Sequence, residues 1–262
     1  MTDVYDFHAG ESPLLISVPH DGREVPPELA GQMSEAGLAL PDTDWHVARL
    51  YDFVRDLGAH LLVADYSRYV VDLNRPASDE SLYPGQVATG LCPERTFAGD
   101  DIYMAGGVSA EDIADRVATY WQPYHTQIRT VLDALRKQHG FAVIWDAHSI
   151  PSRVPRLFDG ELPVLNVGTH GGRSCAPAIG SVVYEIASSS PYSAILNGRF
   201  QGGFITRHYG DRANHVHAVQ LEIAQRAYMD EVSGIYDTEK ATRLRGTLRT
   251  MLETCIEIAE RG

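Results

Sequence analysis

The chain has 262 residues, of which 44% are hydrophobic and 22% charged, so it is long enough to bury the core of one large globular domain. Its net charge of −13, with lysine and arginine scattered along the chain, argues against a nucleic-acid partner. Three widely separated cysteines without a CxxC pair argue against a disulfide framework and a thiolate zinc site.

The N-terminal sequence MTDVYDFHAGESP has no basic start followed by an apolar stretch, and no run approaches the length of a transmembrane helix. We therefore expect a cytoplasmic protein without a membrane partner. Internal repeats, low-complexity segments and linkers are absent from the sequence, which predicts a single domain over residues 1–262.

Apolar runs bounded by turn residues alternate with helical patterns along the chain, which is typical of an α/β fold. Several runs are apolar throughout, as in strands that are covered on both faces. The predicted strands are 13–18, 60–64, 68–73, 141–147, 163–168, 204–209 and 217–224. The predicted helices are 42–58, 109–139 with a kink at Pro123, 176–189 and 238–260.

The segment 74–108 is rich in glycine, proline and aspartate and has only weak periodicity. Long irregular segments of compact domains often form lids or walls of functional sites. We expect this segment to have such a role.

Three titratable residues occur at the ends of these apolar strands or inside them. His20 follows the first predicted strand, His148 follows 141–147, and Glu222 stands within the apolar run VQLEIA. Ligands usually bind at the carboxyl ends of strands in open α/β sheets. These residues therefore lie where the pattern predicts burial or a cleft.

Two neutral imidazoles and one carboxylate are a common ligand set for catalytic zinc, and they leave one tetrahedral position for water. His20 and His148 supply the imidazoles, and the carboxylate comes from Asp44 or from Glu24. A further carboxylate outside the ligand set, such as Glu222, could accept the proton of the water.

Each of these residues also has a plain structural interpretation. Backbone groups usually satisfy an isolated strand-end histidine, and the helix dipole alone favours Asp44 in a first helical turn. Asp146, two residues before His148 on the same strand face, either orients that imidazole or caps a turn. A structural ion pair with an arginine is the alternative for Glu222, because a carboxylate in an apolar strand needs a partner or a function.

A second group of residues is cationic and comprises Arg68, Arg75 and Arg207. Arg68 and the pair Asn74-Arg75 flank the predicted strand 68–73, and Arg207 follows a glycine pair. Arginine binds carboxylates with a two-pronged geometry, and an asparagine can donate beside it. Taken singly, each arginine is more simply a solvated surface charge.

Long blocks of the chain carry a family pattern, in order from about residue 13 to about residue 260. They include PLLISVPHDGREVP, DTDWHVARLYDF, SRYVVDLNRP, WDAHSIPSRVPRLFDG, GRFQGGFITRHYG and VHAVQLEIAQRAYMDE. These blocks resemble the N-formylglutamate amidohydrolase family. The resemblance implies a hydrolase that converts N-formyl-L-glutamate to formate and L-glutamate in histidine degradation. It also implies a three-layer α/β/α fold with a mixed, mostly parallel sheet, related to zinc carboxypeptidases and aspartoacylases.

The same resemblance implies that His20, Asp44 and His148 hold Zn²⁺. Carboxypeptidases use an HxxE pair, but position 23 of this chain is arginine, which favours Asp44 over Glu24 as the carboxylate ligand. Manganese, cobalt or iron would also suit such a ligand set.

The resemblance further implies that Glu222 is the general acid/base and that Arg68 polarises the carbonyl. Asn74 and Arg75 would bind one substrate carboxylate and Arg207 the other. Two other functions stay open. One is an amidohydrolase for another N-acyl amino acid, such as N-formyl-aspartate. The other is a non-catalytic protein that binds an acidic amino acid and needs neither zinc nor Glu222.

Overall fold

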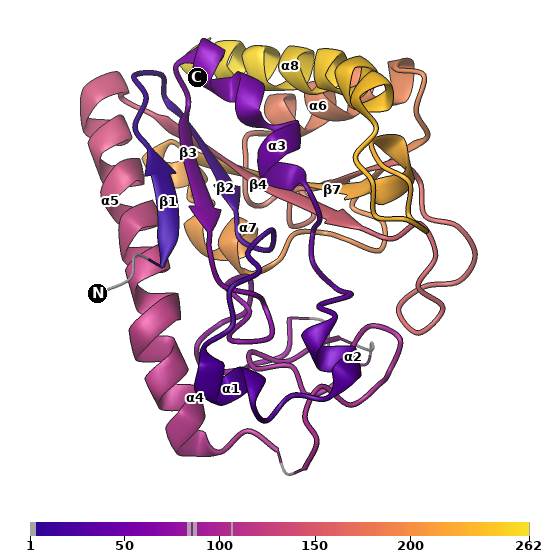
Figure 1. Cartoon of the computed structure of the whole chain (residues 1–262). Helices are drawn as coiled ribbons and strands as arrows, with labels where there is room; N and C mark the ends of the chain where they lie inside the picture. Colours follow the sequence, from indigo (N-terminus) through magenta and orange to yellow (C-terminus); the bar gives the residue numbers. More distant parts are fainter. Residues whose placement is uncertain (1–3, 83–84, 86–87, 106, 262) are drawn as a thin grey trace.

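A seven-stranded sheet lies between two layers of helices in the computed structural model, which describes residues 4–82, 85, 88–105 and 107–261 (Figure 1). The strands are β1 (Tyr5–His8), β2 (Leu14–Val18), β3 (His60–Ala64), β4 (Ala142–Ile150), β5 (Leu165–Gly168), β6 (Ala194–Leu196) and β7 (Val216–Ala224). Their order in the sheet is β1-β3-β2-β4-β7-β5-β6. Only the pairs β1/β3 and β7/β5 among these strands are antiparallel, so the predicted mixed, mostly parallel sheet is confirmed.

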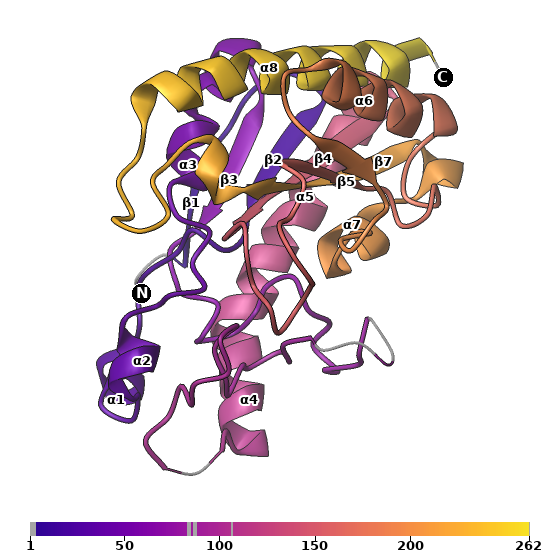
Figure 2. The ribbon, with the colours of Figure 1, turned by 90° about the vertical axis from the view of Figure 1, so that its right-hand side faces the viewer.

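Helices cover both faces of the sheet (Figure 2). The α-helices are α1 (Pro27–Ala30), α2 (Glu35–Leu38), α3 (Val47–Leu50), α4 (Ala110–Arg116), α5 (Gln122–His139), α6 (Pro177–Ser189), α7 (Phe204–Tyr209) and α8 (Thr238–Arg261). Short turns of other helix types are η1 (Asp52–Leu57), η2 (Val117–Trp121), η3 (Arg212–Asn214) and η4 (Gln225–Ala227). Buried side chains of α3, α6 and α8 pack on one face, and those of α5 and α7 pack on the other.

The central strand β4 shows why these sequences form a sheet that is buried on both sides. All nine of its residues are buried. Val143 and Trp145 pack toward α6 and α8, whereas Ala142 and Ile144 pack toward α5. This alternation follows from the two-residue period of a strand. The carboxyl ends of β2, β4 and β7 lie at one edge of the sheet, because these three neighbouring strands are parallel.

Between β3 and α4 the described residues form no helix or strand of the sheet. This part of the chain lies below the sheet in Figure 1, together with α1 and α2. The irregular structure predicted for 74–108 is thereby confirmed for its described residues.

Two of the predicted strands are wrong. The run 68–73 begins in a turn, in which Val70 N donates to Ser67 O. Its buried apolar side chains belong to two different core clusters, and the described residues give it no partner strand. The run 204–209 forms helix α7, in which Ile205 and Tyr209 share the buried face at a spacing of four residues. Periodicity cannot distinguish a strand from a helix in so short a run.

Two predicted helices differ in detail. Over 42–58 the helical part begins only at Val47, because His46 has a φ of 66° and the residues before it are turns or irregular. The kink expected at Pro123 is a π-helical segment, η2, that ends two residues before it. The sequence analysis missed the edge strands β1 and β6, which are four and three residues long.

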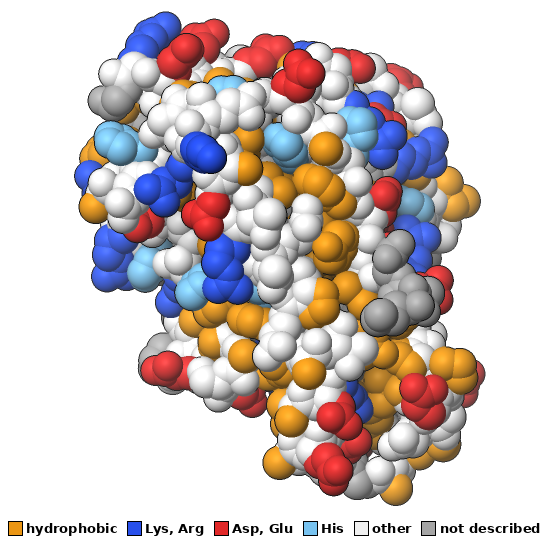
Figure 3. All heavy atoms as spheres, turned by 90° about the vertical axis from the view of Figure 1, so that its left-hand side faces the viewer, with side chains coloured by type: hydrophobic (Ala, Val, Ile, Leu, Met, Phe, Trp, Pro, Cys, Tyr) orange, Lys and Arg blue, Asp and Glu red, His pale blue; other side chains and the backbone are white. Residues whose placement is uncertain are grey.

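The charge on the surface and the length of the helices can be compared with the expectation of neither a nucleic-acid nor a membrane partner. Acidic and basic side chains both occur on the face shown in Figure 3, and the basic ones form no continuous stripe on it. No helix among the described residues is both long and apolar enough to cross a membrane.

Candidate metal centre and its cavity

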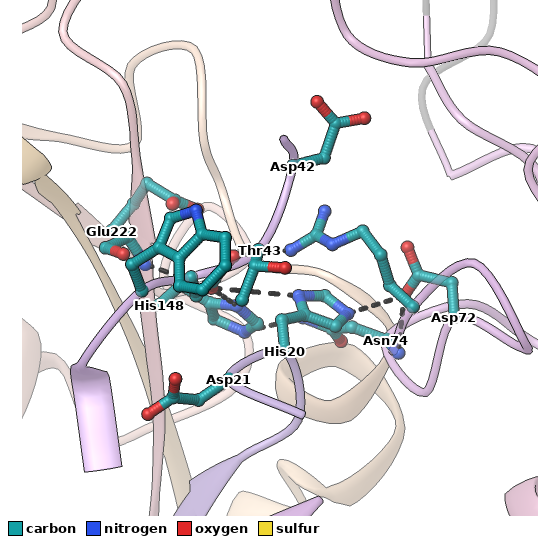
Figure 4. Close-up of polar contacts among 12 residues, drawn as sticks. His20, Asp21, Asp42, Thr43, Asp72, Asn74, His148 and Glu222 are labelled. Carbon is teal, nitrogen blue, oxygen red and sulfur yellow. Dashed lines mark hydrogen bonds and ion pairs between the residues drawn. The ribbon is translucent and has the colours of Figure 1, made fainter. Parts of the chain in front are cut away.

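The carboxyl ends of three neighbouring strands position His20, His148 and Glu222. His20 follows β2 after Pro19, and His148 pairs with Glu222 across the β4/β7 ladder. Figure 4 shows the two imidazole rings side by side, and their centroids are 4.9 Å apart. Sheet order thus brings together residues that are more than 200 positions apart in the chain.

His20, Asp44 and His148 form a buried cluster that could hold a metal ion. One ligand atom from each lies within 4.8 Å of the other two. Asp44 Oδ2 is 3.1 Å from Nδ1 of His148 and 3.8 Å from Nδ1 of His20. The His20 Nδ1 atom is buried and has no hydrogen-bond partner among the described residues. A buried nitrogen without a partner is rare, and it fits a metal ligand.

Carboxylates behind the two imidazoles fix which nitrogen faces the cluster. His20 Nε2 donates to Asp72 Oδ1 at 2.7 Å, and His148 Nε2 lies 3.0 Å from Asp146 Oδ1. Nε2 of each ring therefore faces an outer carboxylate and Nδ1 faces the cluster, as in metal-binding histidines with an outer carboxylate. This role was expected for Asp146 but not for Asp72. Asp72 stands in the apolar run YVVDL, so it offered the same signal as Glu222.

Asp44 is held by two donors. Arg68 Nη2 donates to its Oδ1 at 2.6 Å, and Ser149 N donates to its Oδ2 at 3.0 Å. Burial by itself would raise the pKa of Asp44, but Arg68 and the bond from His148 outweigh it and hold the pKa below its usual range. Asp44 is therefore a carboxylate. Glu24 is exposed and lies outside the cluster.

Glu222 is buried beside the cluster. Burial raises its pKa to about 8, so this carboxyl group can exchange a proton near neutral pH. Gln220 Nε2 lies 3.5 Å from Glu222 Oε2, at the limit of a hydrogen bond.

A cavity opens onto the two histidines of the cluster. His20, His148 and Glu222 line it together with Arg68, Arg75 and Arg199. Apolar contact is offered by Phe97, Ile150, Leu157 and Phe200.

Asn74 and Arg75 both line this cavity, but they are held differently. The Asn74 amide is engaged inside the protein, since Nδ2 donates to Asp146 Oδ2 at 3.0 Å and Oδ1 accepts from Ile205 N at 2.8 Å. It fixes Asp146 and the start of α7. Arg75 donates to Thr89 O at 2.8 Å, to Thr89 Oγ1 at 3.1 Å and to Asn74 O at 3.0 Å. These bonds hold its guanidinium at the cavity wall.

Arg207 is not among the described residues that line the cavity. Its guanidinium donates to Gly202 O and to Leu82 O, each at 2.8 Å, and so ties α7 to neighbouring segments. Arg199, which the sequence analysis did not single out, lines the cavity instead. A lone arginine in a loop carries no sequence signal that separates it from a surface charge.

The chain is similar to known proteins of one family. A family model described as N-formylglutamate amidohydrolase matches residues 12–229. The chain is 46% identical over 259 residues to the N-formylglutamate deformylase of Pseudomonas putida, covering 98% of this chain and 97% of that protein. It is 48% identical over 259 residues to the N-formylglutamate deformylase of Pseudomonas aeruginosa, with the same coverage.

Solved structures share the fold. The crystal structure of an N-formylglutamate amidohydrolase from Ralstonia eutropha JMP134 matches with a TM-score of 0.81 at 23% identity, covering 98% of this chain and 97% of that one. The gene product Atu2144 from Agrobacterium tumefaciens matches with a TM-score of 0.75 at 17% identity, covering 97% and 95%.

Proposed function

Because the chain belongs to the N-formylglutamate amidohydrolase family, we propose that it hydrolyses N-formyl-L-glutamate to formate and L-glutamate. The observation that carries this proposal is the buried His20–Asp44–His148 cluster, whose two histidines line one cavity together with Glu222. As a step of histidine degradation, this activity fits the cytoplasmic location expected from the sequence.

His20, Asp44 and His148 are the proposed ligands of one divalent metal ion. Two imidazole nitrogens and one carboxylate oxygen suit Zn²⁺, and Mn²⁺, Co²⁺ or Fe²⁺ can occupy similar sites. When bound, such an ion supplies a Lewis acid for the formyl carbonyl and lowers the pKa of bound water to about 7.

Glu222 is the proposed general base and acid. Its carboxylate accepts a proton from water, and the resulting carboxylic acid donates that proton to the leaving amine. Its position opposite His148 in the β4/β7 ladder places it beside the proposed ligands. A pKa raised to about 8 by burial supports a group that both takes up and returns a proton.

Arg68 is the proposed donor to the oxygen that becomes negative when the carbonyl is attacked. Its Nη2 is bound to Asp44, which holds the side chain at the cavity. The Arg68 Nε atom is buried and has no partner in the described part of the chain. One well-placed donor of this kind typically contributes about 3 kcal/mol to transition-state stabilisation.

Formate release separates this function from its alternatives. We expect purified protein to release formate from N-formyl-L-glutamate much faster than from N-formyl-L-aspartate, to stop after treatment with a chelator, and to recover when metal is restored. Equal rates on both substrates would indicate a broader amidohydrolase. Binding of acidic amino acids without formate release would indicate a binding protein. The buried Glu222 favours the enzyme, because a binding protein gains nothing from the cost of burying this carboxyl group.

A further inference from the structure

The cavity gathers cationic side chains against the overall charge of the chain. Arg68, Arg75 and Arg199 line it, and Glu222 is the one acidic residue among its described lining residues. The whole chain has a net charge of −13. Arg68 is paired with Asp44 at 2.6 Å, so its charge is balanced within the cluster. Arg75 and Arg199 add two further positive charges to the lining of the cavity.

Arg75 lines the cavity and interacts electrostatically with Asp72, the hydrogen-bond partner of His20. It directly follows Asn74, whose Nδ2 lies 2.9 Å from Nε2 of the proposed ligand His148. Three hydrogen bonds, to Thr89 and to the Asn74 backbone, fix the guanidinium before a ligand arrives. A preorganised guanidinium loses little entropy when it binds a carboxylate.

Arg199 reaches the cavity from a different wall. It follows β6 in the chain, and its Nε donates at 2.8 Å to the backbone oxygen of Leu157, in the segment between β4 and β5. Its guanidinium carbon lies 5.5 Å from the ring centroid of Phe200. Leu157 and Phe200 also line the cavity and offer apolar contact to methylene groups.

We propose that Arg199 binds the side-chain carboxylate of the substrate and that Arg75 binds its α-carboxylate. This inference rests on the proposed function, which places the formyl group at the metal cluster. In N-formyl-L-glutamate the α-carboxylate carbon is two bonds from the formyl-bearing nitrogen, and the side-chain carboxylate carbon is four bonds away. The arginine next to Asn74 therefore meets the nearer carboxylate. Arg199 would then give substrates with an acidic side chain a higher affinity than substrates with a neutral one.

Substrate analogues that neutralise one carboxylate at a time test this assignment. N-formyl-L-glutamine lacks the side-chain charge, and N-formyl-L-isoglutamine lacks the α-carboxylate charge. We expect Arg199→Gln to lower kcat/KM for N-formyl-L-glutamate roughly 10- to 100-fold, mainly through KM, and to change kcat/KM for N-formyl-L-glutamine by less than about threefold. Arg75→Gln should behave in the reciprocal way, sparing N-formyl-L-isoglutamine.

Two further variants separate charge from packing. Arg199→Lys also loses the bond to Leu157 but keeps the charge, so it should recover part of the activity that Arg199→Gln loses on N-formyl-L-glutamate. Arg153→Gln removes an exposed arginine that is paired with Glu161, and it should leave all rates unchanged. Comparing substrates within one variant makes the result independent of small differences in folded fraction.

The outcomes are distinct. Equal losses on the glutamate and glutamine substrates in Arg199→Gln would overturn the role of Arg199, and a larger loss on N-formyl-L-glutamine would do the same. Calorimetric binding of L-glutamate and L-glutamine provides the same comparison without turnover. Inactivity of the unsubstituted protein on N-formyl-L-glutamate, with preferential binding of L-glutamate that depends on Arg199, would contradict the proposed function but support this inference.

Discussion

Single carboxylates behind the histidines decide how the proposed ligands are oriented. Asp72 accepts the Nε2 proton of His20 and also the backbone N–H of Asn74 at 2.8 Å. Asp72→Asn preserves the size of the side chain but removes its charge. We expect metal affinity to fall roughly 10- to 100-fold, as is usual when an outer partner of a metal-binding histidine is changed. Competition with a chromogenic chelator measures this, and exposed Asp159→Asn is the control. Unchanged affinity would show that Asp72 does not support the site.

We propose that Glu222 transfers the proton and that His148 binds the metal, so substitutions of the two residues should have different effects. Glu222→Gln should keep its metal and lose turnover by about 10²-fold or more, because the amide cannot accept the proton. His148→Ala should lose both metal and turnover. Elemental analysis combined with the formate assay distinguishes the two variants, and Glu239→Gln and His8→Ala serve as exposed controls. Normal rates in Glu222→Gln would remove this residue from the mechanism.

The raised pKa of Glu222 also predicts how stability depends on pH. Unfolding lowers that pKa from about 8 to about 4.5, so the folded protein retains a proton that the unfolded chain releases between these values. The contribution of this group to the free energy of unfolding therefore falls as pH rises through that window. We expect metal-depleted Glu222→Gln to gain stability relative to the unsubstituted protein between about pH 5 and pH 8, as measured by urea unfolding. A difference that does not change with pH would contradict the raised pKa.

At the scale of elements, the sequence predicted the strands that carry the proposed site better than the segments that surround it. The runs before His20 and around His148 and Glu222 are long and apolar, so their burial in a sheet could be recognised. The run 204–209 was misassigned because six residues do not establish a period. The start of its helix is held by hydrogen bonds that Phe204 N and Ile205 N donate to Asn74. Such tertiary contacts have no local signal.

Substitutions at two glycines test whether tight packing at the start of α7 matters more for stability than helix propensity within α8. A Cβ at Gly203 would lie 2.5 Å from Asn74 Nδ2, so Gly203→Ala must displace the amide that holds Asp146 and α7. We expect a lower Tm and weaker metal binding. Gly246 lies inside α8 with open space around its Cβ position, so Gly246→Ala should stabilise the protein by about 0.5–1 kcal/mol. Thermal unfolding of both variants checks this contrast, and a neutral Gly203→Ala would contradict it.

At the scale of the whole molecule, the sheet assembles the cluster from three remote segments. His20, Asp44 and His148 were singled out from the sequence because strand ends, a ligand-like residue set and a family resemblance coincided there. Arg199 escaped notice because its place at the cavity depends on the packing of the segments after β4 and β6. Residue type therefore predicted the His20–Asp44–His148 cluster, whereas the place of Arg199 at the cavity required three-dimensional structure.

We expect His20, Asp44 and His148 to bind one metal ion in this fold. Anomalous diffraction from crystals of the metal-loaded protein, recorded at the absorption edge of the metal, tests it most directly. We predict one strong peak about 2.0–2.2 Å from Nδ1 of both histidines and from a carboxylate oxygen of Asp44. A fully active, metal-loaded protein whose only peak lay away from these three residues would contradict the account.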